Sequence, residues 1–211
     1  MNRVAGQSAG FTLIEVLVSS LLMLIVTATI FGAYRFQMFA LKTQETQLEA
    51  QQAARGMIDL MSRELRQAGY DPTCAKTFAG IVNAQPQLLQ LQFDSNGDGA
   101  IGAGESVTYS YNADLQQIGR SAGGSAVPLI SGVPAGALTF SYYDGTGTLL
   151  APSGNPAVLS ATQRAAVRRV KIVLRVQRTN PDPLNASSVV SDVVSNVDLR
   201  NRFINSGVAC P

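Results

Sequence analysis

The stretch GFTLIEVLVSSLLMLIVTATIFGA, residues 10–33, carries a single charged side chain, Glu15, and no proline. From Phe11 to Ala33 it exceeds the ~20 apolar residues that a helix needs to cross a bilayer core of ~30 Å. An ionised carboxylate in hydrocarbon is costly unless it finds a partner, so an acid in such a segment is a candidate functional residue. The stretch itself supplies no cation, and the partner of Glu15 must therefore come from elsewhere.

A short polar leader, residues 1–10, precedes this stretch and ends in Gly10. Cleavage after Gly10 would give Phe11 a free α-amino group, which a neighbouring copy could present to Glu15. The order Gly-Phe-Thr-Leu-Ile-Glu over residues 10–15 resembles the class III signal of type IV prepilins and pseudopilins. That resemblance implies removal of the leader by a prepilin peptidase, N-methylation of Phe11 and assembly into a filament that spans the periplasm.

Two other interpretations of the same stretch compete with this one. An ordinary secretory signal peptide would use residues 11–26 as its apolar core, with a cleavage site at residues 26–28. Against it, Glu15 lies inside the apolar core, and Arg3 is the only charge in the leader. A plain membrane anchor would leave Glu15 unexplained.

The absence of proline between Phe11 and Asp71 allows the helix to continue far beyond the membrane. Apolar residues there recur at three- and four-residue spacing, which predicts an amphipathic helix: Ala50, Ala54, Met57, Ile58, Met61 and Leu65. Gly69 and Pro72 are typical of a helix end. We expect one helix over residues 11–68, roughly 85 Å long, whose first part (11–35) lies in lipid or a filament core and whose second part (36–69) packs on a domain.

Residues 70–211 read as a β-rich globular domain, because short apolar alternations are separated by Gly, Pro, Asn and Ser. The predicted strands are 89–93, 107–111, 115–120, 127–131, 137–143, 167–178 and 188–199, and residues 121–126 and 144–165 are predicted loops. The clearest strand has Val170, Ile172, Leu174 and Val176 on one face and basic residues on the other, as expected for an antiparallel strand covered on a single side. The fold class is therefore α+β.

A long N-terminal helix followed by a strand-rich domain resembles the pilin fold. Residues 61–70 (MSRELRQAGY) and 199–202 (LRNR) are similar to PilW-type minor pilins, with the J-type pseudopilins of type II secretion as near relatives. The resemblance implies a structural subunit that primes pilus assembly near the tip. Its implied partners are other minor pilins, the major pilin, a prepilin peptidase and the bacterial inner membrane, with the C-terminal domain in the periplasm. A pseudopilin role is the alternative.

Residues 94–105 (DSNGDGAIGAGE) fit the twelve-residue calcium loop of EF-hand proteins position by position. Asp94, Asn96 and Asp98 would supply side-chain oxygens, Ala100 its carbonyl, and Glu105 two carboxylate oxygens, with a water near Gly102. The flanking segments are β-like, so the site would be a strand–loop–strand with a structural Ca²⁺. The competing interpretation is a turn rich in Asp, Asn and Gly that binds nothing.

The remaining residues limit the function further. Cys74 and Cys210, the only cysteines, are expected to form a disulfide if the domain lies outside the cytoplasm; two unpaired thiols are the alternative.

Basic residues cluster on and around residues 164–178 and could contact DNA phosphates or an anionic surface. A solvated strand face explains them better, and we expect no nucleic-acid partner. The chain has no His, no legible serine–base pairing and no G-x-S-x-G motif, so we do not expect an enzyme.

Overall fold

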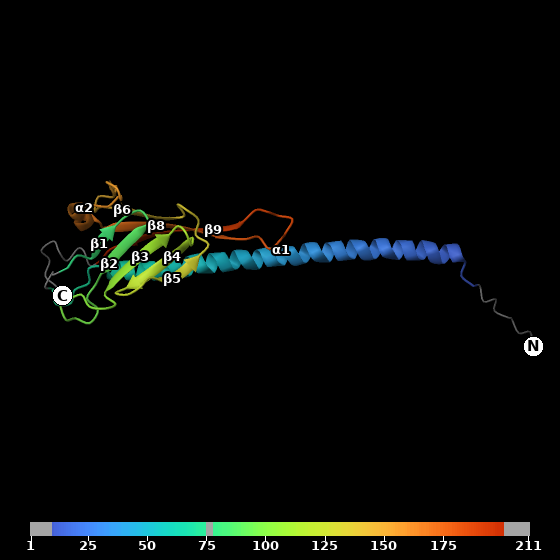
Figure 1. The fold of residues 1–211 in the computed structure, drawn as a ribbon, viewed down its shortest axis with the longest axis horizontal. Helices are drawn as coiled ribbons and strands as arrows, with labels where there is room; N and C mark the ends of the chain where they lie inside the picture. Colours follow the sequence, from blue (N-terminus) through green and yellow to red (C-terminus); the bar gives the residue numbers. More distant parts are fainter. Residues whose placement is uncertain (1–9, 75–77, 201–211) are drawn as a thin grey trace, which may run out of the picture.

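The computed structural model describes residues 10–74 and 78–200. One long helix, α1 (Leu13–Gln67), runs from the N-terminal end into a compact strand-rich domain, and about half of it projects from that domain (Figure 1). At 1.5 Å per residue its 55 residues span about 80 Å. Thr12 is the N-cap, Ala68 the C-cap, and Gly69 follows with φ +74°. The single long helix predicted over residues 11–68 is confirmed.

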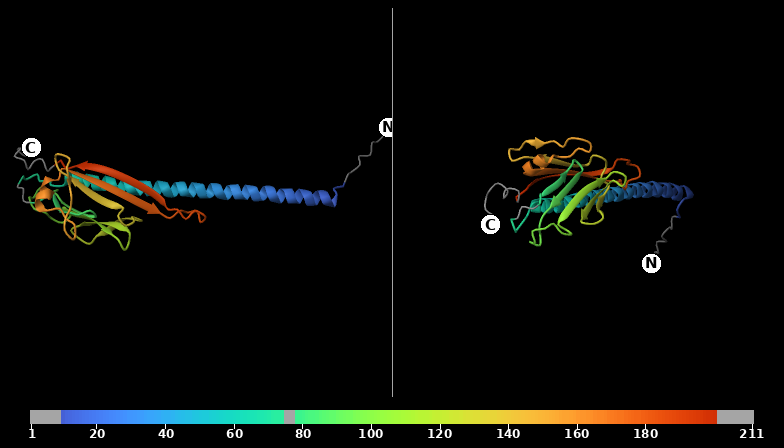
Figure 2. Two further views of the ribbon diagram at one scale, coloured as in Figure 1. Left: turned by 90° about the horizontal axis from the view of Figure 1, so that it is seen from above. Right: turned by 60° about the vertical axis from the view of Figure 1, so that its left-hand side comes forward.

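The domain contains two antiparallel sheets whose strands follow one another closely along the chain (Figures 1 and 2). The first has the order β1-β2-β3-β4-β5 and the second β7-β6-β8-β9. The strands of the first sheet are β1 (Ile81–Ala84), β2 (Leu88–Gln92), β3 (Ser106–Asn112), β4 (Gln117–Ala122) and β5 (Val127–Ser131). Those of the second are β6 (Leu138–Tyr143), β7 (Leu149–Leu150), β8 (Arg169–Arg178) and β9 (Val189–Asp198).

The helix and both sheets share one apolar core. All six residues of the predicted helical stripe are buried, and α1 lies along β8 and β9 and touches β5. On β8, the four predicted inward residues from Val170 to Val176 are fully buried, whereas Arg169 and Arg175 on the opposite face are exposed. The predicted one-sided burial of this strand is confirmed.

The structure differs from the sequence prediction in three short elements and at one boundary, because β4 extends to Ala122, inside the predicted loop 121–126. The predicted loop 144–165 contains β7 and the start of α2 (Ala161–Ala166), and β1 was not predicted at all. Each of these elements has six residues or fewer, which is too short to show a periodicity. The helix α2 is instead marked by a capping box, in which Ser160 and Gln163 each bond the backbone N–H of the other.

The predicted disulfide involves a residue outside the described part of the chain. Cys74 lies in the connection between α1 and β1, but Cys210 falls within residues 201–211, which the structure does not describe. The pairing of Cys74 with Cys210 stays a prediction, as does the removal of the leader, most of which also lies outside the described residues.

Candidate metal centre and membrane helix

The acidic loop, residues 94–105, connects β2 to β3 at the end of the domain farthest from the helix N-terminus (Figure 1). Its base is closed by a bond from the Phe93 N–H to the Glu105 carbonyl, at 3.1 Å. The Asp94 N–H donates to the Tyr70 carbonyl at 2.8 Å, and the Gly69 N–H donates to the Gln92 carbonyl at 2.8 Å. The loop is therefore fastened to the chain that leaves the C-terminal end of α1.

The loop backbone wraps around the buried carboxylate of Asp94. Its Oδ1 accepts a bond from the Gly97 N–H at 2.7 Å, and its Oδ2 accepts one from the Gly99 N–H at 2.9 Å. Both glycines have φ near +78°, in the left-handed region that other residues rarely adopt. These two glycines explain why the loop can turn tightly enough to point two amides at one side chain.

Glu105, at the other end of the loop, is held in the same way and is only 3 % exposed. Its Oε2 accepts a bond from the Gly102 N–H at 2.7 Å, and its Oε1 accepts bonds from the backbone N–H groups of Ser95 and Asn96 and from the Ser95 hydroxyl. These bonds, the one from Gly102 above all, lower the pKa of Glu105 to about 2. The carboxylate is therefore ionised at neutral pH.

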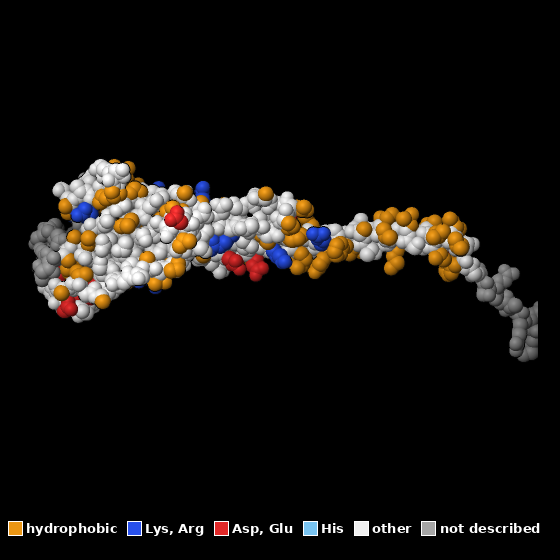
Figure 3. Space-filling view, viewed as in Figure 1, with side chains coloured by type: hydrophobic (Ala, Val, Ile, Leu, Met, Phe, Trp, Pro, Cys, Tyr) orange, Lys and Arg blue, Asp and Glu red, His pale blue; other side chains and the backbone are white. Residues whose placement is uncertain are grey.

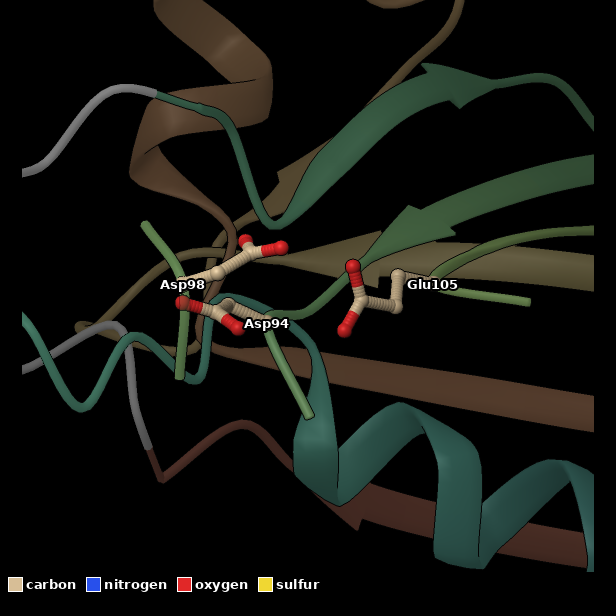
Figure 4. Close-up of side chains that lie close together, drawn as sticks. All are labelled: Asp94, Asp98 and Glu105. Atoms are coloured by element: carbon tan, nitrogen blue, oxygen red, sulfur yellow. The ribbon is translucent and has the colours of Figure 1, made fainter. Parts of the chain in front are cut away.

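Asp94, Asp98 and Glu105 bring their carboxylates together in the loop, with one oxygen of each within 4.8 Å of the others (Figure 4). Asp98 is exposed, and its two oxygens accept bonds from the Ala100 N–H and the Asn96 side-chain amide. Each carboxylate oxygen has two lone pairs, so both oxygens of Asp94, both of Asp98 and Oε2 of Glu105, with one bond each, keep acceptor capacity for a cation. Oε1 of Glu105 already accepts three bonds. Hard oxygen donors with three negative charges match the ligands that Ca²⁺ prefers.

The structure thus assembles three of the five predicted ligands directly. The other two lie beside Asp98: the Ala100 N–H and the Asn96 side-chain amide donate to its carboxylate, and the Asn96 Oδ1 accepts a bond from the Asp98 N–H at 3.0 Å. The predicted strand–loop–strand setting is confirmed, because β2 and β3 flank the loop.

A second polar cluster, which the sequence did not reveal, joins α1 to the first sheet. The Arg120 guanidinium on β4 donates to the Glu64 carboxylate on α1, with Nη2 and Oε1 2.7 Å apart, and the Tyr109 hydroxyl on β3 donates to the same carboxylate. Burial raises the pKa of Tyr109 above its usual value, so that the hydroxyl remains a donor. Glu64 is 45 positions from Tyr109 and 56 positions from Arg120 along the chain, so no local sequence pattern indicates that the three meet.

The basic residues around β8 are largely engaged with neighbours. Arg169 pairs with Asp198 and Arg175 with Asp192, both on β9 and both at 2.7 Å. Arg178 donates to the Ser131 carbonyl, Arg164 to that of Leu159, and Arg168 to that of Ala165. The two ion pairs with β9 offset the charges of Arg169 and Arg175 and so favour the interpretation of this strand face as a solvated one. The prediction about nucleic acid itself stays untested.

The projecting half of α1 has no cover within the described chain. Every residue from Gly10 to Met38 is exposed, and apolar side chains gather along this half in Figure 3. It is the one described helix that is long and apolar enough to cross a membrane. Glu15 lies in its first turn, where its N–H donates to the Thr12 hydroxyl, and none of the ion pairs among the described residues includes it.

Comparison with known proteins decides the family. A model of the prokaryotic N-terminal methylation motif matches residues 6–31, which include Gly10, Phe11 and Glu15. A model described as prepilin peptidase-dependent protein B matches residues 43–149, about half of the chain. The chain belongs to the prepilin peptidase-dependent protein B family. The methylation motif covers the predicted signal, and the family model covers the chain that follows it. Together they confirm the prediction of a type IV pilin-like protein with a class III signal.

Family membership establishes the coarse function. The chain is a type IV pilin-like, prepilin peptidase-dependent protein, and its signal and apolar helix indicate membrane anchoring in the context of pilus assembly. Such proteins are structural and are not known as enzymes.

Among solved structures, a type IV-like pilin from Thermus thermophilus is similar at 13 % identity with a TM-score of 0.41, over 71 % of this chain and 96 % of that one. A search for similar curated proteins found none.

Proposed function

We propose that this protein is a minor pilin, a structural subunit that takes part in assembling or priming a type IV pilus near its tip. The observation that carries the proposal is the projecting half of α1, which is apolar, fully exposed in the single chain, and charged only at Glu15 until Arg35. Lipid can cover such a surface before assembly, and parallel helices of other subunits can cover it afterwards. A neighbouring subunit also supplies a cation for Glu15, which the hydrocarbon core of a bilayer does not.

The cation would be the α-amino group of a neighbouring subunit that begins at Phe11 or its equivalent. Because Glu15 lies in the first turn of α1 and Phe11 comes just before the N-cap Thr12, the amine of a subunit displaced slightly along the fibre axis can meet this carboxylate. An uncompensated charge in apolar surroundings is strongly destabilising. The pairing would therefore set the axial stagger between subunits rather than merely add affinity.

The orientation follows from the same proposal. The leader side of α1 would stay in the cytoplasm, and residues 70–211 would lie in the periplasm of the bacterial inner membrane before they reach the pilus. Partners would be other minor pilins and the major pilin, which contact α1 by helix packing.

We also propose that residues 94–105 bind one structural Ca²⁺. The support is the convergence of Asp94, Asp98 and Glu105 at the point where the loop meets the end of α1. A bound cation would offset the mutual repulsion of three carboxylates and hold the loop against the segment from Tyr70 to Cys74. Its role would be to stiffen the distal end of the domain where external calcium is high.

Deletion of the gene tests the main proposal, since a priming subunit is needed in small amounts for every fibre. We expect the number of surface pili to fall sharply and to recover when the full-length chain is supplied in trans. Unchanged piliation together with failure of type II secretion would contradict the proposal and favour the pseudopilin role.

A further inference from the structure

The connection between β8 and β9, residues 179–188, forms an ordered arm that extends beside α1 toward the helix N-terminus, past the rest of the domain (Figures 1 and 2). Its base contacts the helix, where the Thr43 hydroxyl lies 3.2 Å from the Asn180 side-chain oxygen. The single proton of this hydroxyl is shared with the Phe39 carbonyl, at 2.9 Å. The Asn180 side-chain oxygen accepts a bond from the Asp182 N–H at 3.0 Å. We call residues 179–188 the β8–β9 arm.

The tip of the β8–β9 arm presents one bare apolar side chain. Leu184 is 90 % exposed, the highest value for any large apolar residue in the described ranges. Its position is set by local bonds: the Leu184 N–H donates to the Asp182 carboxylate at 3.0 Å, and the Asn185 N–H donates to the Asp182 carbonyl at 3.1 Å. Pro181 and Pro183 flank Asp182 and restrict the backbone further. The arm therefore holds Leu184 out into the surroundings.

The level of this tip along α1 can be worked out from two contacts. Ser62 lies opposite Ser195 of β9, and Thr43 lies opposite Asn180, so that the arm continues the line of the β8–β9 hairpin toward the membrane end of the helix. The apolar run of α1 ends at Ala33. The ten residues from Ala33 to Thr43 span about 15 Å along the helix axis. The four residues from Asn180 to Leu184 would span ~14 Å if fully extended, but the bonds around Asp182 turn the chain there, so Leu184 lies less than ~14 Å from the level of Asn180.

A reach of about 7–10 Å from the level of Thr43 is enough for the tip to meet the outer edge of the headgroup layer of a bilayer. The headgroup region adds about 5–8 Å on each side of the hydrocarbon core. With the apolar run of α1 in the core, the layer begins at Ala33 and covers the next turns of the helix, which carry Tyr34, Arg35 and Phe36. Aromatic and basic side chains are enriched at membrane interfaces, so the helix surface at this level has the composition of an interface too.

The charge of the β8–β9 arm is compatible with such a contact. Its only ionisable residue is Asp182, whose carboxylate accepts a hydrogen bond from the Leu184 N–H. The other side chains beyond Asn180 are neutral. Several acidic residues would be repelled by anionic lipids, but this arm has only one, and the side chain at its tip is the apolar Leu184.

We propose that the β8–β9 arm is a second membrane contact, in which Leu184 inserts into the headgroup layer of a phospholipid bilayer while α1 anchors the unassembled subunit. Two points of attachment fix the rotation of the domain about the helix and hold it close to the membrane until the subunit is extracted. The inference rests on membrane anchoring by α1 and not on the minor-pilin role, so it stands or falls separately from the proposed function.

Tryptophan fluorescence tests the contact cleanly, because the chain contains no Trp. Leu184→Trp would be compared with Leu149→Trp on β7, which is also exposed (56 %) but pairs with Tyr143 at the opposite end of the second sheet. The full-length proteins are reconstituted into vesicles of phosphatidylethanolamine and phosphatidylglycerol, with and without brominated lipid. Matching thermal transitions would show that both variants fold.

We expect brominated lipid to quench Leu184→Trp, with emission shifted to shorter wavelength, and to leave Leu149→Trp unchanged. Quenching should persist as the protein is diluted into more lipid. Equal responses of the two variants would overturn the proposal. A wavelength shift that disappears on dilution would also overturn it, because the arm would then be contacting a second copy.

Discussion

The Glu64–Arg120–Tyr109 cluster offers the sharpest test of how α1 is fixed to the domain. Glu64→Gln keeps the shape of the side chain but removes the charge that receives bonds from Arg120 and the Tyr109 hydroxyl. Breaking a buried ion pair costs about 3–5 kcal/mol because one charge is left without compensation. The Glu64 side chain is 12 % exposed and that of Arg120 27 %, so water can partly re-solvate the guanidinium.

We therefore expect a loss of about 2–3 kcal/mol, below the full value for a buried pair. In a domain of this size, each kcal/mol shifts the melting temperature by about 2–4 °C, which gives a fall of about 4–12 °C. The assay is thermal unfolding followed by circular dichroism, on a soluble fragment that begins at Gln37. Glu49→Gln, on an exposed position of the same helix, is the matched control and should change the transition by less than about 2 °C.

A double variant separates the pair from the single residue. Glu64→Leu with Arg120→Leu should destabilise by less than the sum of the two single changes, because neither charge is then left alone. If Glu64→Gln melts within the range of Glu49→Gln, the cluster does not hold the helix to the sheet and the reasoning is refuted.

Two further predictions concern the acidic loop in the same fragment. Calcium at a hundredfold excess over Kd should add about 2.7 kcal/mol to the free energy of unfolding, which raises Tm by about 5–11 °C. Asp98→Asn should abolish most of this rise. The control Asp144→Asn, in a turn outside the acidic group with similar local bonds, should keep it. No thermal shift of the wild type in millimolar Ca²⁺ would contradict a calcium site. In calcium-free buffer, the lowered pKa of Glu105 means that its stabilising contribution is complete above about pH 4.5 and is lost as the pH falls toward 2. Glu105→Gln should therefore show a flatter decline in stability, measured by urea unfolding, over that interval; a slope equal to that of the wild type would show that these bonds do not stabilise the fold.

The elements that could be predicted correctly are those whose sequence pattern lies within one short stretch of the chain. The stripe from Ala50 to Leu65 repeats at helical spacing, and β8 alternates over ten residues, so both buried faces were identified before the structure. The acidic loop was equally legible, since all its candidate ligands lie within twelve consecutive residues and Gly97 and Gly99 supply the tight turns.

What the sequence left hidden depends on contacts between distant residues. Tyr109 and Arg120 meet Glu64 only because β3, β4 and α1 are brought together by the common core. The partners of the basic residues on β8 were hidden for the same reason: Asp192 and Asp198 come opposite Arg175 and Arg169 through the register of β9. Such pairs follow from strand register, which single residues do not reveal.

The exposed tip of the β8–β9 arm illustrates a different limit. Leu184 follows Pro183 in a polar segment, and nothing in its neighbourhood along the chain distinguishes it from an ordinary loop residue. Its interest comes from its level along α1, which the Thr43–Asn180 contact defines.

The central claim is that Glu15 is matched by the terminal amine of another subunit once the apolar half of α1 leaves the lipid. The direct measurement is the amount of this protein in sheared pili from cells that produce Glu15→Leu at wild-type membrane levels, with Glu45→Gln as the control on an exposed part of the same helix. We expect the Glu15→Leu protein to accumulate in the membrane and to be nearly absent from pili, while Glu45→Gln is incorporated normally. Incorporation of Glu15→Leu at the level of the control would contradict the account.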